Sequence, residues 1–153
     1  MTYVGKHDPI EVLLVEDNPG DVRLTREAFE SAANYCRISV VSDGEEALAY
    51  LRRQGKYREA PSTDLVLLDL NLPKVDGQEV LRNVKGDRTL ASIPVIVFTS
   101  SDALSDISAV YALHANSYVT KPKDLDEFLD LAENIKAFWF RAAKLPTRHG
   151  LVQ

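Results

Sequence analysis

The stretch that decides the fold is Leu65-Val66-Leu67-Leu68-Asp69-Leu70-Asn71-Leu72-Pro73. It begins with a run of Leu and Val, and such a run is typical of a parallel strand that is buried on both faces. Asp69 follows the run directly. Open α/β sheets bind their ligands beyond the carboxyl ends of the strands, so a carboxylate is well placed there. Taken alone, an Asp after a strand is more often a helix cap or a turn former.

Further short apolar runs occur along the chain, and each is rich in β-branched residues, which favours strand. They are Val12 to Val15, Ile38 to Val41, Val95 to Phe98 and Tyr118 to Thr120. Between them, apolar residues recur at helical spacing. Such alternation predicts an α/β fold with a parallel sheet and helices on both faces. We expect a single doubly wound (βα)5 flavodoxin-like domain, with a parallel five-stranded sheet of order 2-1-3-4-5.

Local signals predict where the helices begin and end. Asn18-Pro19 is typical of a cap followed by proline at the first helical position. Asp43 precedes Glu46 by the spacing of a capping box. Gly86 is expected to end the third helix. The stretch 55–63 is polar, contains Gly and Pro, and is predicted to be a loop.

Composition bounds the function. The chain has 153 residues, is 45% hydrophobic and carries a net charge of -5, which fits one domain. We expect the domain to cover residues 10–143, with an extension at 1–9 and a tail at 144–153. No basic stripe is evident, so nucleic acid is not an expected partner. No apolar run suits a signal peptide or a membrane span. The single cysteine, Cys36, fits a cytoplasmic location.

Polar residues stand at the carboxyl ends of four predicted strands. Glu16 and Asp17 follow the first, Asp69 the third, Thr99 the fourth and Lys121 the fifth. In a 2-1-3-4-5 sheet the first and third strands are neighbours, so the three carboxylates should meet in one crevice. Each residue alone could be a helix cap or an ordinary surface residue. Five such residues at four strand ends favour a shared site.

The residue types predict phosphoryl chemistry. Three close carboxylates repel one another unless a cation or proton intervenes, and oxygen ligands with room for water suit Mg²⁺. Lys121 offers a positive charge for a phosphoryl oxygen, and Thr99 offers a hydroxyl. A carboxylate can itself be the nucleophile and form an aspartyl phosphate. The cluster therefore offers a nucleophile, a metal site, a cation and a hydroxyl, which suit the positioning and charge neutralisation that phosphoryl transfer demands.

The chain resembles a response-regulator receiver domain of two-component signalling over about residues 10 to 140. The resemblance is carried by the strand-end residues described above together with Pro73, Asp76-Gly77 and Tyr118. The resemblance implies a role for each of these residues. Asp69 is the phosphoacceptor, and Asp17 and Asp69 ligate Mg²⁺, with Glu16 acting mostly through water and Asn71 through its backbone carbonyl. Lys121 and Thr99 bind the phosphoryl group, and Thr99 and Tyr118 form the switch pair.

A narrower resemblance lies in Leu68 to Pro73, Tyr111 to Tyr118 and the segment from Phe138 to Pro146. These segments are similar to the stand-alone response regulators of bacterial phytochromes. That likeness implies a phytochrome-type sensor histidine kinase as phosphodonor and a homodimer through the last two helices and the tail. The sequence departs from many receivers at Lys123, where an aromatic residue is usual.

Helix geometry supports a contact surface at the same place. Successive residues of a helix are rotated by about 100°, so the consecutive aromatics Phe138, Trp139 and Phe140 cannot all face one core. At least one should point outward, and we expect these three residues to form an interface.

These features favour a signalling protein over an enzyme. We expect this signalling protein to support its own phosphorylation and dephosphorylation. The short segment after Lys121 leaves no room for a DNA-binding domain, so we expect output through protein contacts. A phosphohydrolase would want a second acid where Asn71 stands. A flavodoxin-like cofactor binder would want a phosphate loop in place of Glu16-Asp17. A pseudo-receiver, which binds partners without phosphorylation, stays an alternative.

Overall fold

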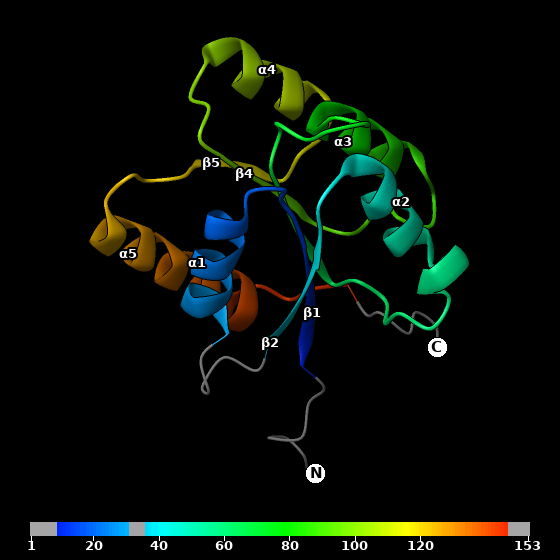
Figure 1. Cartoon of the computed structure of the whole chain (residues 1–153), viewed down its shortest axis with the longest axis horizontal. Helices are drawn as coiled ribbons and strands as arrows, with labels where there is room; N and C mark the ends of the chain where they lie inside the picture. The colour runs from blue at the N-terminus through cyan, green and yellow to red at the C-terminus, as the bar shows by residue number, and fades with distance from the viewer. Residues whose placement is uncertain (1–8, 31–35, 147–153) are drawn as a thin grey trace.

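Parallel strands form the centre of the structure, a computed structural model that describes residues 9–30 and 36–146 (Figure 1). The sheet has five strands in the order β2-β1-β3-β4-β5, which confirms the predicted topology. The strand bounds are β1 Ile10–Val15, β2 Cys36–Val41, β3 Leu65–Leu68, β4 Val95–Thr99 and β5 Ser117–Thr120. Every residue of β3 and β4 is buried, as expected for central strands that are covered on both faces.

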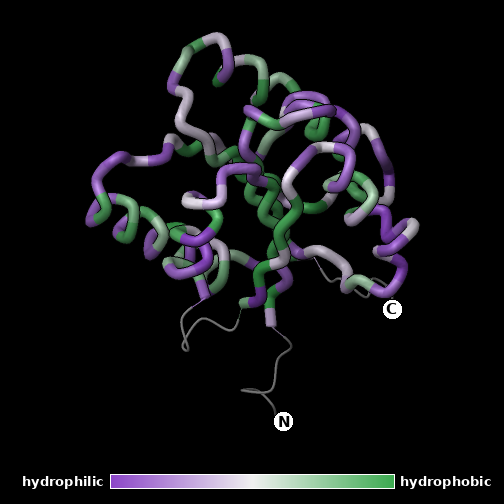
Figure 2. Tube along the Cα trace, viewed as in Figure 1, coloured by the Kyte–Doolittle hydropathy of each residue, from purple (hydrophilic) through white to green (hydrophobic). Residues whose placement is uncertain are grey.

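The helices cover both faces of this sheet (Figure 1). Their bounds are α1 Pro19–Phe29, α2 Gly44–Arg52, α3 Gly77–Gly86, α4 Leu104–Ala112 and α5 Leu125–Lys136. A π-helical segment, Ala137–Ala142, continues α5. Apolar residues gather along the central strands, whereas hydrophilic and hydrophobic residues alternate along the helices (Figure 2). The fold is therefore the predicted doubly wound α/β domain.

Alternation along β1 divides the core into two clusters. Leu13 and Val15 face the cluster beneath α2, α3 and α4. Val12 and Leu14 face the cluster beneath α1 and α5. Successive side chains of a strand point to opposite faces, so one apolar run supplies both cores.

The predicted helix signals are confirmed. The Asn18 side chain caps α1 by accepting a hydrogen bond from the backbone of Asp21 at 2.9 Å. The Asp43 side chain caps α2 in the same way, with Glu46 as donor at 2.8 Å. Gly86 is the last residue of α3.

One segment is more ordered than the predicted loop. Within residues 55–63, Gly55–Tyr57 forms a short 3-10 turn, η2. The Tyr57 ring packs edge-on against Tyr50, with 5.1 Å between ring centroids, and its hydroxyl donates to Glu46. These contacts with α2 hold the turn, and they depend on tertiary packing that local composition does not report.

The aromatics after α5 separate as expected. The Phe138 side chain is 55% exposed, whereas Trp139 and Phe140 pack against the cluster beneath α1 and α5. The Phe140 ring lies edge-on to Phe29, at 6.4 Å between centroids. The prediction that at least one of the three points outward is confirmed, and that residue is Phe138.

The outer limits of the domain stay predictions. The predicted extension at 1–9 and tail at 144–153 lie largely outside the described residues, which exclude 1–8 and 147–153. Within the ranges that are described, no helix has the length and apolar character that crossing a bilayer requires.

A close backbone approach fixes the loop that follows β3. The Gly77 amide donates to the Leu70 carbonyl at 3.0 Å. A Cβ atom on Gly77 would lie 2.5 Å from the Asp69 carbonyl oxygen and 2.6 Å from the Leu70 Cα. Only glycine lets α3 begin directly against the end of β3, and this contact holds the backbone at Asp69.

We predict that Gly77→Ala lowers the free energy of unfolding by about 2 kcal/mol or more, because the added methyl group overlaps backbone atoms that cannot move aside. Urea unfolding followed by circular dichroism measures the change. Gly86→Ala, in the same helix, is the matched control, since a Cβ there meets nothing within 4 Å. Equal stability of the two variants would contradict the packing argument.

Candidate functional site

The strand register brings the predicted polar residues to one edge of the sheet. The Asp69 amide donates to the Val15 carbonyl at 3.0 Å, which places Asp69 beside the end of β1. The Lys121 amide donates to the Thr99 carbonyl at 2.8 Å, which joins the ends of β4 and β5 in the same way. The site is therefore assembled by backbone pairing of the parallel strands.

Three carboxylates form the acidic part of the site. Glu16, Asp17 and Asp69 each offer an oxygen, and these oxygens all lie within 4.8 Å of one another. Glu16 and Asp69 are buried, while Asp17 is exposed. Hard oxygen ligands that are open to solvent on one side fit Mg²⁺, which keeps several waters. The backbone N–H of Asn71 donates to Asp69 Oδ1 at 3.3 Å, whereas a metal-binding role for the backbone carbonyl of Asn71 stays a prediction.

The ammonium of Lys121 is buried between the carboxylates. Its Nζ donates to Glu16, to Asp21 Oδ2 at 3.0 Å and to Asp69 Oδ2 at 3.3 Å. Asp21 is a site residue that the sequence prediction missed. Asp21 lies in the first turn of α1, whereas Asp17 precedes that helix, so no local spacing in the sequence relates Asp21 to the site.

The site shifts the ionisation of its own groups. Burial raises the pKa of Glu16 from 4.5 to about 7, although the hydrogen bond and charge of Lys121 oppose the shift. Burial acts to lower the pKa of Lys121, but hydrogen bonds with Glu16 and Asp21 and the charge of Asp69 together raise it. The lysine therefore stays a cation, and Glu16 takes up a proton near neutral pH when no metal is bound.

Thr99 makes a hydrogen bond to the acidic site, and Tyr118 makes one to the loop that follows β4. The buried Thr99 Oγ1 donates to Asp69 Oδ1 at 2.8 Å. The Tyr118 hydroxyl donates to the Ser101 carbonyl at 2.7 Å, and Ser101 Oγ donates to Asp106 Oδ2 on α4 at 2.6 Å. The β4–α4 loop thus links the acidic site to α4. The switch role of Thr99 and Tyr118 stays a prediction.

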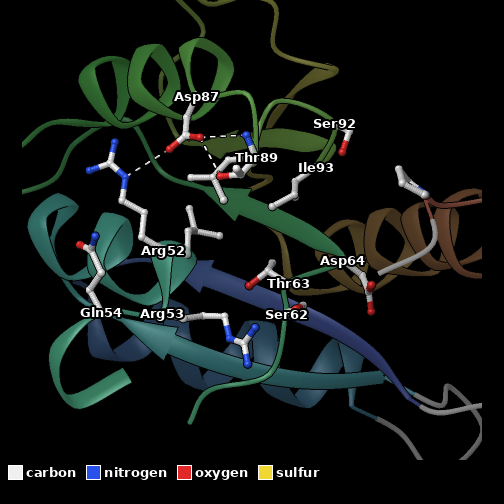
Figure 3. Close-up of a pocket in the computed structure, with 13 residues that line it drawn as sticks. Arg52, Arg53, Gln54, Ser62, Thr63, Asp64, Asp87, Thr89, Ser92 and Ile93 are labelled. Carbon is white, nitrogen blue, oxygen red and sulfur yellow. Dashed lines mark hydrogen bonds and ion pairs between the residues drawn. The ribbon is translucent and has the colours of Figure 1, made fainter. Parts of the chain in front are cut away.

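A separate pocket of about 700 Å³ lies at the opposite end of the sheet (Figure 3). Its lining includes Asp64 and Ile93, which precede β3 and β4, together with Arg52 and Arg53 at the end of α2. Asp87 faces Arg52 at 3.5 Å in this pocket. None of the five strand-end residues lines it, so this pocket is separate from the acidic site.

Comparison with known families and proteins agrees with this geometry. The response regulator receiver domain family matches residues 12–133. Response regulator Rcp1 of Synechocystis sp. is 41% identical over 138 residues, which cover 90% of this chain and 94% of that protein. The probable methanogenesis regulatory protein FilR2 of Methanothrix harundinacea is 44% identical over 133 residues, which cover 86% of this chain and 84% of FilR2.

Solved structures show the same similarity. The phosphorylated cyanobacterial phytochrome response regulator RcpA is 45% identical, with a TM-score of 0.88 and coverage of 91% of this chain and 99% of RcpA. The Mn²⁺-bound form of Rcp1 is 40% identical, with a TM-score of 0.86 and coverage of 91% and 100%. The bacteriophytochrome response regulator AtBRR is 42% identical, with a TM-score of 0.71 and coverage of 87% and 96%.

We predict that Mg²⁺ affinity falls by up to about tenfold between about pH 8 and about pH 6, because a proton on Glu16 competes with the metal. The sign follows from the raised pKa of about 7: the carboxylate form that attracts Mg²⁺ is lost as the pH falls through that value. Calorimetric titration in buffers of different ionisation enthalpy measures both the affinity and the proton release.

The matched variants are Glu16→Gln and Glu59→Gln. Glu16→Gln should bind Mg²⁺ more weakly and lose the proton release, because no titrating carboxyl remains at that position. Glu59 is exposed in the loop before β3, so its variant should behave like the parent. A pH dependence that survives Glu16→Gln would exclude Glu16 as its source.

Proposed function

Because the chain belongs to the response regulator receiver domain family, we propose that it accepts a phosphoryl group on Asp69 from a sensor histidine kinase. The observation that carries the proposal is the position of Asp69: its carboxylate is within hydrogen-bond reach of both Lys121 and Thr99 and within the acidic cluster. The protein is a signalling protein.

In the proposed reaction, an Asp69 carboxylate oxygen attacks the phosphorus of a phosphohistidine. The new O–P bond forms as the P–N bond breaks, and the imidazole leaves with the electron pair and takes up a proton. Mg²⁺, when bound, neutralises charge on the phosphoryl oxygens. Lys121 and Thr99 donate hydrogen bonds to those oxygens. The chain supplies in-line placement and charge, which are the main demands of phosphoryl transfer.

The metal ligands in this proposal are Asp17 and Asp69, with Glu16 acting mostly through water and Asn71 through its carbonyl. Support comes from the three-carboxylate geometry and from Rcp1, a similar protein whose structure holds Mn²⁺. Water that enters the same site would attack the aspartyl phosphate, so the chain would also support its own dephosphorylation. We place the protein in the cytoplasm, where such kinases present their phosphohistidine.

A phytochrome-type kinase is the proposed phosphodonor. RcpA is described as a phytochrome response regulator and AtBRR as a bacteriophytochrome response regulator, at 45% and 42% identity. A pseudo-receiver would not need Asp69, Thr99 and Lys121 together, so the presence of all three disfavours that alternative. A phosphohydrolase would need an acid at position 71, where this chain has Asn71.

Output is proposed to run through protein contacts and not through nucleic acid. When Asp69 is phosphorylated, Thr99 and Lys121 are drawn to the phosphoryl group, and Tyr118 and the β4–α4 loop follow. Large apolar side chains are exposed on α4, on α5 and on the segment after it: Leu104, Tyr111, Leu125, Leu129 and Phe138. We propose that they form a homodimer contact.

Asp69→Asn should abolish phosphorylation by acetyl phosphate, a loss of at least about 100-fold, because the amide cannot act as the nucleophile. Phosphate-affinity electrophoresis separates the phosphorylated form, and removal of Mg²⁺ with EDTA should suppress labelling of the parent. Asp130→Asn, at an exposed position of α5, is the control and should label normally. Labelling of Asp69→Asn at the parental level would refute the assignment.

Phe138→Ala should weaken the proposed homodimer by about tenfold, because an exposed aromatic anchor is removed. Sedimentation velocity over a concentration series measures the change. Phe140→Ala is the informative contrast: its ring packs against Phe29, so it should lower the free energy of unfolding by about 2 kcal/mol. A dimer unaffected by Phe138→Ala would remove this residue from the interface.

A further inference from the structure

Asp21 lies at the mouth of the site and has no role in the proposed phosphoryl transfer. It belongs to the first turn of α1, where the Asn18 side chain accepts from its backbone amide at 2.9 Å. Its side chain is 40% exposed, and Oδ2 lies 3.0 Å from Lys121 Nζ. The helix cap therefore presents a solvent-facing carboxylate to the cation that the phosphoryl group needs.

Lys121 is held by more than its bond to Asp21. An ammonium has three N–H donors, and two of the three observed bonds of Lys121 go to the buried groups Glu16 and Asp69. These two bonds and the burial of the side chain hold Lys121 in place. The third bond, to Asp21 at 3.0 Å, places a partly exposed negative charge at the entrance.

That charge matters because the site is already acidic. Lys121 is the cation that meets the carboxylates of Glu16, Asp21 and Asp69, and Asp17 adds one more. Even with a divalent cation bound, the formal charge of these groups is negative. An incoming phosphodonor is an anion, so it is repelled by Asp21 and competes with it for Lys121.

We propose that Asp21 is a specificity-determining residue that disfavours loading of Asp69 by small, free anionic phosphodonors. It acts through Lys121 and through its own charge, and it does not touch the phosphorus atom. A docked kinase delivers its phosphohistidine by surface contacts that a small molecule lacks, so the penalty falls mainly on the small donor. The inference rests on the proposed role of Asp69 as phosphoacceptor.

The test is the initial rate of loading with acetyl phosphate in Mg²⁺, at donor concentrations well below saturation. Asp21→Asn should load about fivefold faster at low ionic strength, since one negative charge near the donor is removed. The gain should shrink in high salt, because the pair is partly exposed and is screened. It should also be smaller with phosphoramidate, which carries less negative charge than acetyl phosphate.

Matched variants separate charge from structure. Asp21→Glu keeps the charge and should load like the parent. Glu27→Gln removes a charge from an exposed position of the same helix and should also load like the parent. Asp21→Ser is a second neutral variant, to be used if Asp21→Asn folds poorly, because serine suits the first turn of a helix. Thermal unfolding by circular dichroism reports the stability of each.

A loss of a merely structural contact would slow loading, so faster loading is the diagnostic result. The inference is overturned if the neutral variants load no faster than the parent, or if their gain is the same for both donors and insensitive to salt. An Asp69→Asn sample runs in parallel. Labelling of that variant would overturn the proposed function instead, so the two failures are distinguishable.

Discussion

The pairing of β1 with β3 is the constraint on which the rest of the structure depends. Val15 lies beside Leu68 in this parallel register, so the residues that follow each strand, Glu16 and Asp69, leave the sheet side by side. Chain order reverses around β1, because β2 lies on its other side. A slip of one residue would turn the apolar side chains of β1 to the wrong core and would separate the carboxylates.

Electrostatic repulsion between buried carboxylates destabilises the fold at that edge of the sheet. Glu16 and Asp69 are buried close together, an arrangement that costs free energy unless a cation intervenes. In the absence of metal the buried ammonium of Lys121 and a proton on Glu16 supply compensation, and the pKa of Glu16, about 7, records the cost. Thr99 and Lys121 already contact Asp69, so a change of charge at that carboxylate acts on these two residues directly.

Much of this arrangement was predictable from the sequence. Short β-branched runs and helix-spaced apolar residues predict the strands and helices, and the caps at Asn18 and Asp43 form as their spacing indicates. Asp69 and Lys121 are predictable as neighbours because parallel strands end at one edge. Asp21 and the 3-10 turn at Gly55–Tyr57 were not predicted. Their positions depend on where α1 lies relative to Lys121, after β5, and on how Tyr57 packs against α2, and no local pattern reports such contacts.

By itself, the sequence determined the order of the elements, the strand ends that carry polar groups and the chemistry those groups can perform, because periodicity and side-chain type are local properties. Only the tertiary structure decided that Lys121 bonds to Asp21 as well as to Glu16 and Asp69, and that Phe138 is the aromatic that faces outward. Both outcomes depend on distances between segments remote along the chain, and these are set by the packing of whole helices against the sheet.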